Sequence, residues 1–227
     1  MTRADVKLRI SASADAARRG AAELLAEAAM RGGHLALSGG STPGPAYELA
    51  AALQPDWSRS QLWFADERCV ALDDERSNYR LVRERLLDRL EGRPAAEHRV
   101  RGELPPEEAA ELYDSELRGV TLDFALLGIG PDGHTASLFP TDPALEQRER
   151  RAVAVHRPDA DRVTMTIPVL RDAAMVVFLV VGRDKAPAVA RALGDITDPA
   201  TPASLVRSER GTTYGFLDRA AAAELVT

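Results

Sequence analysis

A histidine follows a glycine-rich turn near the middle of the chain. Residues 124–127 are continuously apolar, as expected for a parallel strand that is covered on both faces. Three glycines, a proline and an aspartate fall within the next six residues, and His134 follows at once. In open α/β sheets, ligands bind beyond the carboxyl ends of the strands. His134 is therefore a candidate general base, because the turn would deliver its imidazole to that edge of the sheet.

The same glycines also fit the dinucleotide-binding pattern G-x-G-x-x-G, from Gly128 to Gly133. That pattern requires a long helix that begins at the third glycine, and an acidic residue at the end of the next strand. Pro131 lies inside the motif, Pro140 closes the segment, and Glu149 lies in a run of charges rather than at a strand end. The sequence therefore argues against a nicotinamide cofactor, and we expect no cofactor.

A second candidate site element is the segment Ser38-Gly-Gly-Ser-Thr-Pro-Gly44, which joins an expected strand to an expected helix. Its glycines let the backbone approach a ligand closely, and free N–H groups at the start of a helix attract phosphate. An ordinary strand-to-helix turn with a hydroxyl cap explains the same residues equally well. The segment is not a Walker loop, because no Gly-Lys-Ser/Thr follows it.

Two further polar groups lie near expected strand or helix ends. Asp66-Glu67-Arg68 follows the expected strand at residues 61–65 and would reach the same edge of the sheet, although a solvated charge run explains the triplet better when it is taken alone. Asn78 is the only asparagine in the chain and has no evident structural role beside Ser77, a suitable helix cap. Cys69 is more typical of a small buried side chain than of a nucleophile.

Lysine is nearly absent from this chain. Of the 29 basic residues only Lys7 and Lys185 are lysines, a bias that makes any single arginine weak evidence of function. Lys185 lies in the first turn of an expected helix that ends at Leu193, where its charge opposes the helix macrodipole. The sequence therefore indicates a negatively charged ligand near Lys185.

Apolar strands alternate with amphipathic helices along the whole chain, which predicts an α/β fold with a mostly parallel central sheet and helices on both faces. No repeat, linker or boundary interrupts the pattern, so we expect one domain over residues 1–227. The expected strands cover residues 6–10 (near an edge), 34–37, 61–65, 124–127, 152–156, 162–167, 175–181 (central) and 214–217, with a short one at Val100. The expected helices cover residues 13–30, 43–53, 77–90, 105–119 and 182–193, with a helical turn at 203–206 and a short C-terminal helix.

Composition restricts the partners. The net charge of −6 and the pI near 5.3 argue against nucleic acid and anionic membranes, while a small anionic substrate remains compatible with local Arg and Lys. The longest apolar run, residues 173–182, is too short to span a bilayer, and the N-terminus has no signal-peptide core. With a single cysteine, these features favour a cytoplasmic protein. The four histidines show no metal-ligand spacing, so we expect no metal.

Five motifs, taken together and in order, resemble those of 6-phosphogluconolactonases. The resemblance covers nearly the whole chain and implies a single-domain, modified Rossmann-like sandwich. It also implies metal-independent hydrolysis of 6-phospho-D-glucono-1,5-lactone to 6-phospho-D-gluconate, a step of the oxidative pentose phosphate pathway. The motifs are Ser38-Gly-Gly-Ser-Thr-Pro43, Asp66-Glu-Arg68 with Ser77-Asn-Tyr79, Gly128-Ile-Gly-Pro-Asp-Gly-His-Thr-Ala-Ser-Leu-Phe-Pro140, Arg162-x-Thr-x-Thr166 and Gly182-x-x-Lys-Ala186.

By this resemblance His134 is the base that activates water. Arg68 stabilises the carbonyl oxygen or orients the substrate and Asp66 orders the site, although a backbone donor of residues 130–133 can take either role. Direct attack by water is favoured, because the chain has no Gly-x-Ser-x-Gly elbow. The implied residues for binding the substrate or its phosphate are Gly39, Gly40, Ser41, Thr42, Asn78, Gly130, Asp132, Gly133, Arg162 and Lys185.

Two alternatives share the scaffold. In sugar-phosphate deaminases and isomerases the histidine loop continues to a catalytic glutamate before a proline, whereas Ala136-Ser-Leu-Phe-Pro140 contains no carboxylate. Related folds also serve as sugar-phosphate-sensing domains of transcription regulators. Only some thirty residues precede the glycine–hydroxyl segment in this sequence, so we expect no separate helix-turn-helix.

Overall fold

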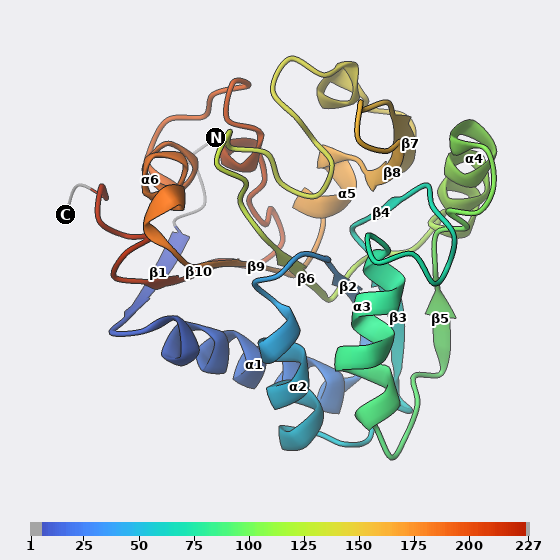
Figure 1. Cartoon of the computed structure of the whole chain (residues 1–227), viewed down its shortest axis with the longest axis horizontal. Helices are drawn as coiled ribbons and strands as arrows, with labels where there is room; N and C mark the ends of the chain where they lie inside the picture. Colours follow the sequence, from blue (N-terminus) through green and yellow to red (C-terminus); the bar gives the residue numbers. More distant parts are fainter. Residues whose placement is uncertain (1–5, 226–227) are drawn as a thin grey trace.

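The computed structural model describes residues 6–225, and its centre is a seven-stranded sheet in which all neighbouring strands run parallel (Figure 1). The predicted central sheet is therefore confirmed, with β1 at one edge and β6 in the middle. In spatial order the strands are β1 (Val6–Ser11), β10 (Thr212–Asp218), β9 (Met175–Val180), β6 (Phe124–Leu127), β2 (Gly33–Leu37), β3 (Ser60–Phe64) and β5 (Ala96–His98).

Helices cover both faces of this sheet, as the sequence predicted (Figure 1). One layer contains α1 (Ala14–Arg31), α2 (Gly44–Leu53), α3 (Asn78–Arg85) and the 3₁₀ turn η1 (Leu87–Arg89). The opposite layer contains α4 (Pro106–Glu116), α5 (Ile167–Arg171) and α6 (Ala186–Leu193). Three further 3₁₀ turns are η2 (Pro143–Glu146), η3 (Arg183–Lys185) and η4 (Pro202–Leu205).

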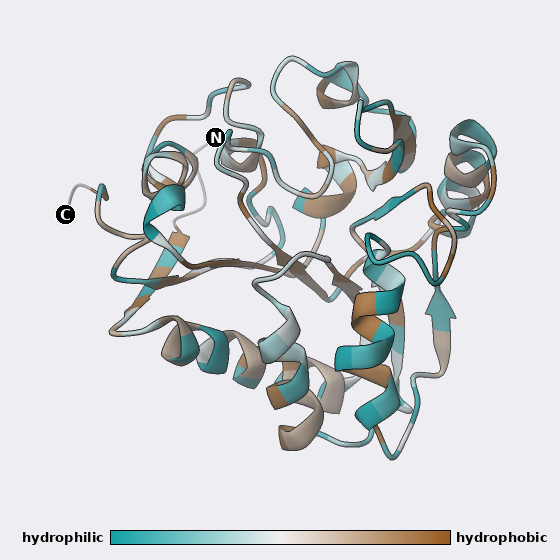
Figure 2. Ribbon diagram, viewed as in Figure 1, coloured by the Kyte–Doolittle hydropathy of each residue, from teal (hydrophilic) through white to brown (hydrophobic). Residues whose placement is uncertain are grey.

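The inner strands are buried on both faces, and successive side chains enter opposite layers. Along β6, Phe124 and Leu126 pack with the α1–α3 layer, whereas Ala125 and Leu127 pack with the α4–α6 layer. This two-sided burial explains why the strands read as continuous apolar runs rather than as alternating ones. Figure 2 shows the same feature as a brown band between two amphipathic layers.

A second, antiparallel sheet was not predicted. It pairs β4 (Asp66–Arg68) with β8 (Arg162–Met165), and β8 with β7 (Ala152–Val155). Asp66-Glu67-Arg68 therefore forms its own strand, and does not merely end β3. Because directly opposed residues share one face of a sheet, Arg68 and its partner Arg162 lie on the same side, and Glu67 points to the other.

Two strand predictions and one helix prediction were wrong. The strand that begins at Arg162 ends at Met165, because α5 starts at Ile167 and holds a proline in its first turn. The short strand is β5, and Val100 lies beyond it as a core residue. The expected C-terminal helix is absent from the described chain, where residues 219–224 form turns.

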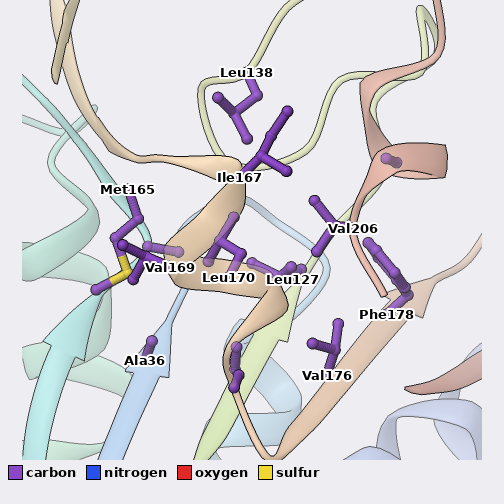
Figure 3. Packing of buried hydrophobic residues seen from close by; sticks show 14 of the residues in the cluster. Ala36, Leu127, Leu138, Met165, Ile167, Val169, Leu170, Val176, Phe178 and Val206 are labelled. Atoms are coloured by element: carbon purple, nitrogen blue, oxygen red, sulfur yellow. The ribbon is translucent and has the colours of Figure 1, made fainter. Parts of the chain in front are cut away.

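Helix α5 carries the packing that supports the candidate histidine loop. Ile167 and Leu170 point from α5 into the core, and Leu138 of the loop lies against Ile167 (Figure 3). Leu138 and Leu170 are fully buried. Apolar contacts of Leu138 therefore anchor the loop after β6 to the core, while polar residues of the same loop remain available for chemistry.

His34 on β2 is expected to make the stability of the fold depend on pH. The Nδ1 atom of His34 accepts a hydrogen bond from the indole N–H of Trp63 at 2.9 Å, which requires this nitrogen to be unprotonated. Burial lowers the pKa of His34, and the Asp123 carboxylate offsets this only in part. The unfolded chain therefore binds the proton more readily, so this contribution to stability is present above about pH 6.5 and is lost as the pH falls.

We expect His34→Asn to reduce the acid sensitivity of the fold, since an amide oxygen can accept the Trp63 hydrogen bond at any pH. The measurement is the midpoint of thermal unfolding at pH 7.5 and at pH 5.5, for wild type and variant. His156→Asn is the control, because the pKa of His156 is raised by Asp161 and its contribution has the opposite sign. An equal acid shift in wild type and His34→Asn would contradict the prediction.

Candidate active site

A cavity of about 230 Å³ opens at the carboxyl ends of β2, β6 and β9. This is where an open α/β sheet places its ligand site. It brings together most of the residues predicted from the sequence, which come from segments far apart in the chain. The predicted residues that line it are Gly39, Gly40, Ser41, Thr42, Asp66, Arg68, Asn78, Gly130, His134 and Lys185.

His134 is held in place by Asp132. One carboxylate oxygen, Oδ1, lies 2.6 Å from His134 Nδ1 and accepts the His134 backbone N–H at 3.1 Å. Burial raises the pKa of Asp132, but the hydrogen bonds and charge of His134 outweigh this effect and hold the pKa below its ordinary value. An ionised Asp132 accepts a hydrogen bond from Nδ1–H, so the second ring nitrogen, Nε2, is free to act as a base. Asp132 thus contributes to the site without lining the cavity.

The glycines of this loop are required by geometry. A Cβ on Gly130 would lie 2.1 Å from the His134 ring, and Gly133 has a φ of 89°. The loop also closes on itself: the Gly130 N–H donates to the His134 carbonyl, and the Gly133 N–H donates to the Gly130 carbonyl. With the His134 N–H on Asp132, three backbone donors are already committed. Of residues 130–133, Gly130 and Gly133 therefore have no free N–H to take the role of Arg68, and Pro131 has no N–H at all.

Arg68 enters the cavity from β4, and the Arg76 carbonyl accepts a hydrogen bond from its guanidinium at 2.5 Å. Its Nε has no hydrogen-bond partner among the described residues. The Arg68 guanidinium is thus oriented by one hydrogen bond and retains donor capacity, so it is suited to stabilise a developing negative charge on a substrate oxygen.

Glu67, which was not among the predicted site residues, holds this arrangement in place. Its buried carboxylate accepts the backbone N–H groups of Arg68, Asn78 and Tyr79, each at 2.7 Å. Burial raises the pKa of Glu67 to about 6, and the three hydrogen bonds oppose that rise. The side chain joins β4 to the first turn of α3, so it positions two cavity residues at once. The alternation along a strand was the signal for it, since it faces away from Asp66 and Arg68.

Asp66 links three segments inside the site. It is buried, it accepts the Ser137 hydroxyl at 2.6 Å, and it accepts the Asn78 amide at 3.2 Å. The Asn78 amide also donates to the Asp66 carbonyl at 2.8 Å. A Cβ on Gly39 would lie 1.8 Å from Asn78 Oδ1, so this position needs glycine. Asn78 therefore has the structural role that its sequence context did not reveal.

The glycine–hydroxyl segment and Lys185 line the same cavity. Gly40 has a φ of 94°, which turns the chain between β2 and α2, and the Thr42 carbonyl is held by Arg18 Nε at 3.2 Å. Lys185 lies at the end of η3, and its side chain is 24% exposed with Asp184 at 3.3 Å. The cavity thus combines N–H groups, hydroxyls and an ammonium, the donors that bind phosphate.

Three other side chains lie apart from the cavity. Arg162 does not line it, and its guanidinium is instead paired with Asp159 at 2.7 Å. His156 is exposed and contacts Glu107 and Asp161, as expected for a surface histidine. Burial raises the pKa of the Cys69 thiol to about 11, which argues against a thiolate nucleophile.

Residues 6–225 contain no helix that is long and apolar enough to cross a membrane. The same residues contain no group of three or more His, Cys, Asp or Glu side chains arranged to hold a metal ion.

The chain matches a family model described as glucosamine-6-phosphate isomerases/6-phosphogluconolactonase over residues 9–214. It is 41% identical to the 6-phosphogluconolactonase of Homo sapiens over 203 residues, which cover 83% of this chain and 79% of that one. It is 36% identical to the 6-phosphogluconolactonase of Synechocystis sp. over 204 residues, with 85% of each chain covered.

Solved structures point to the same family as these sequence comparisons. The 6-phosphogluconolactonase of Thermotoga maritima has a TM-score of 0.78 at 31% identity, and the match covers 95% of this chain and 100% of that one. A monomeric glucosamine-6-phosphate deaminase has a TM-score of 0.84 at 21% identity, over 96% of this chain and 100% of that one, which shows a common fold. This chain belongs to the family of glucosamine-6-phosphate isomerases and 6-phosphogluconolactonases.

Proposed function

We propose that this protein is a carboxylic ester hydrolase that converts 6-phospho-D-glucono-1,5-lactone to 6-phospho-D-gluconate, in the oxidative pentose phosphate pathway and in the cytoplasm. One observation carries the proposal. His134, oriented by Asp132, lines the same cavity as Arg68, Lys185 and the glycine–hydroxyl segment. A base, a cation and a phosphate cradle are the groups that hydrolysis of a phosphorylated lactone requires.

The geometry supports direct attack by water. His134 Nε2 takes a proton from a water molecule as the water oxygen bonds to C1 of the lactone. The carbonyl electron pair moves onto the C1 oxygen, and Arg68 stabilises the resulting oxyanion. When the intermediate collapses, the bond from C1 to the ring oxygen breaks, and the His134 imidazolium returns the proton to that oxygen. The product acid then loses its own proton to solvent.

The deaminase alternative lacks its carboxylate in this structure as well as in the sequence. Ala136 lines the cavity in the loop after His134, and Ser137 next to it donates to Asp66. Turnover of freshly prepared lactone, corrected for spontaneous hydrolysis, tests the proposal directly. Release of ammonia from an amino sugar phosphate would support a deaminase instead, and tight binding of 6-phosphogluconate without turnover would support a sensor.

We expect Lys185→Ala to weaken binding of 6-phosphogluconate about ten- to a hundredfold, because a charge-assisted contact to an anion contributes roughly 1.5–3 kcal/mol. Binding or turnover of the unphosphorylated gluconolactone is expected to change little. Titration calorimetry with 6-phosphogluconate and kcat/KM for both lactones measure the two effects. Lys7→Ala is the matched control, because Lys7 lies on edge strand β1 beside the Tyr214 ring. Equal losses with both ligands would mean that Lys185 is structural.

A further inference from the structure

Arg162 is occupied by an internal carboxylate. Its two terminal nitrogens donate to the two oxygens of Asp159 at 3.1 and 2.7 Å, and Nη1 also donates to the Ala160 carbonyl at 3.0 Å. The Arg162 side chain is 10% exposed, whereas the Asp159 side chain is 66% exposed. The buried partner of this fork-shaped pair is therefore the cation, and the partner that can move into solvent is the carboxylate.

Arg162 does not line the cavity, but it lies near residues that do. It is the antiparallel partner of Arg68, which lines the cavity, so the two side chains leave the small sheet on the same side. Its guanidinium lies 5.4 Å from the Phe139 ring centre, and that ring is 4.7 Å from the His134 ring. To reach the cavity beside Arg68, the Arg162 guanidinium would first have to leave Asp159.

An unpaired guanidinium is unfavourable at this position, because a buried charge beside a like charge has neither water nor a counterion. Asp159 supplies the counterion in the ligand-free protein. The hydrogen bonds from Arg162 lower the pKa of Asp159 to about 2, so the carboxylate remains ionised throughout the neutral range. A phosphate dianion offers the same fork geometry with more charge, and it can take over the pair.

We propose that Asp159 is an internal competitor for the substrate phosphate: it holds Arg162 away from the cavity until a phosphate replaces it, and so it determines affinity for phosphorylated ligands. The identity of the ligand rests on the function proposed above. Arg76 supports the same arrangement, since it donates to the Asp159 carbonyl at 3.1 Å and its own carbonyl holds Arg68. The loop that carries Asp159 is thus tied to the cavity through its backbone, while the carboxylate itself is exposed.

The test is a double-mutant cycle on binding, with 6-phosphogluconate and inorganic phosphate as probes in titration calorimetry. If Asp159 occupies Arg162 for most of the time, Asp159→Asn tightens binding of both probes by about five- to tenfold, because the competent fraction rises by that factor. Asp161→Asn is the matched control. It removes one negative charge from the same loop, but Asp161 pairs with His156 and not with Arg162. Asp161→Asn is expected to tighten binding by less than twofold.

Arg162→Ala provides the second arm of the cycle. In that background, Asp159→Asn is expected to have no more effect than Asp161→Asn, because the guanidinium for which Asp159 and the phosphate compete is absent. The proposal is overturned if Asp159→Asn weakens binding, or if its gain matches that of Asp161→Asn or persists without Arg162. Thermal unfolding of each variant identifies any general loss of structure. Because the readout is binding, absence of lactone turnover would refute the proposed function and leave this result standing.

Discussion

His134→Ala is expected to lower kcat roughly 10²–10⁴-fold, the usual contribution of a general base, with little change in affinity for 6-phosphogluconate. The reason is geometric: Asp132 holds Nδ1, so Nε2 is the nitrogen available for the proton of the attacking water. The alanine variant retains the cavity, the phosphate donors and Arg68, so it should still bind the product.

The assay follows proton release from fresh lactone and subtracts the rate without enzyme, because the lactone also hydrolyses spontaneously. His156→Ala is the matched control, since this histidine is exposed and lies outside the cavity. If His134→Ala turned over within a few-fold of wild type, His134 would have no part in the proton transfer.

Arg68→Ala is expected to lower kcat about 10²–10³-fold, comparable to the loss of an oxyanion donor in other acyl-transfer enzymes. The backbone N–H groups of Gly130, Gly133 and His134 already have acceptors, so they cannot readily replace the guanidinium. Arg68→Lys should recover only part of the rate, because an ammonium lacks the planar fork that the Arg76 carbonyl orients.

Steady-state kinetics separate this role from simple substrate binding. A fall in kcat with unchanged KM indicates an interaction made in the transition state, whereas a rise in KM alone indicates uniform binding. Arg99→Ala is the control, since Arg99 forms a surface pair with Glu103 and does not line the cavity. A variant of Arg68 that altered only KM would reassign the residue to substrate orientation.

The sequence predicted the elements whose signals are local. The β6 run, the cap residue Ser77 and the glycines before His134 each depend on neighbouring residues alone. Burial on both faces makes a parallel strand continuously apolar, and a capping hydroxyl needs only the next turn of its helix. Because parallel strands end at one edge, these local signals also located most of the cavity.

Only the tertiary structure decided which polar residues act together. Asp66 and Glu67 are adjacent in sequence, yet the pairing of β4 with β8 sends them to opposite faces, one to the cavity and one to α3. The same pairing sets Arg162 opposite Arg68, while the Arg162 guanidinium pairs with Asp159 and does not line the cavity. No local pattern contains the strand register, because β4 and β8 are nearly a hundred residues apart in the chain, although Asp159 lies only three residues before Arg162.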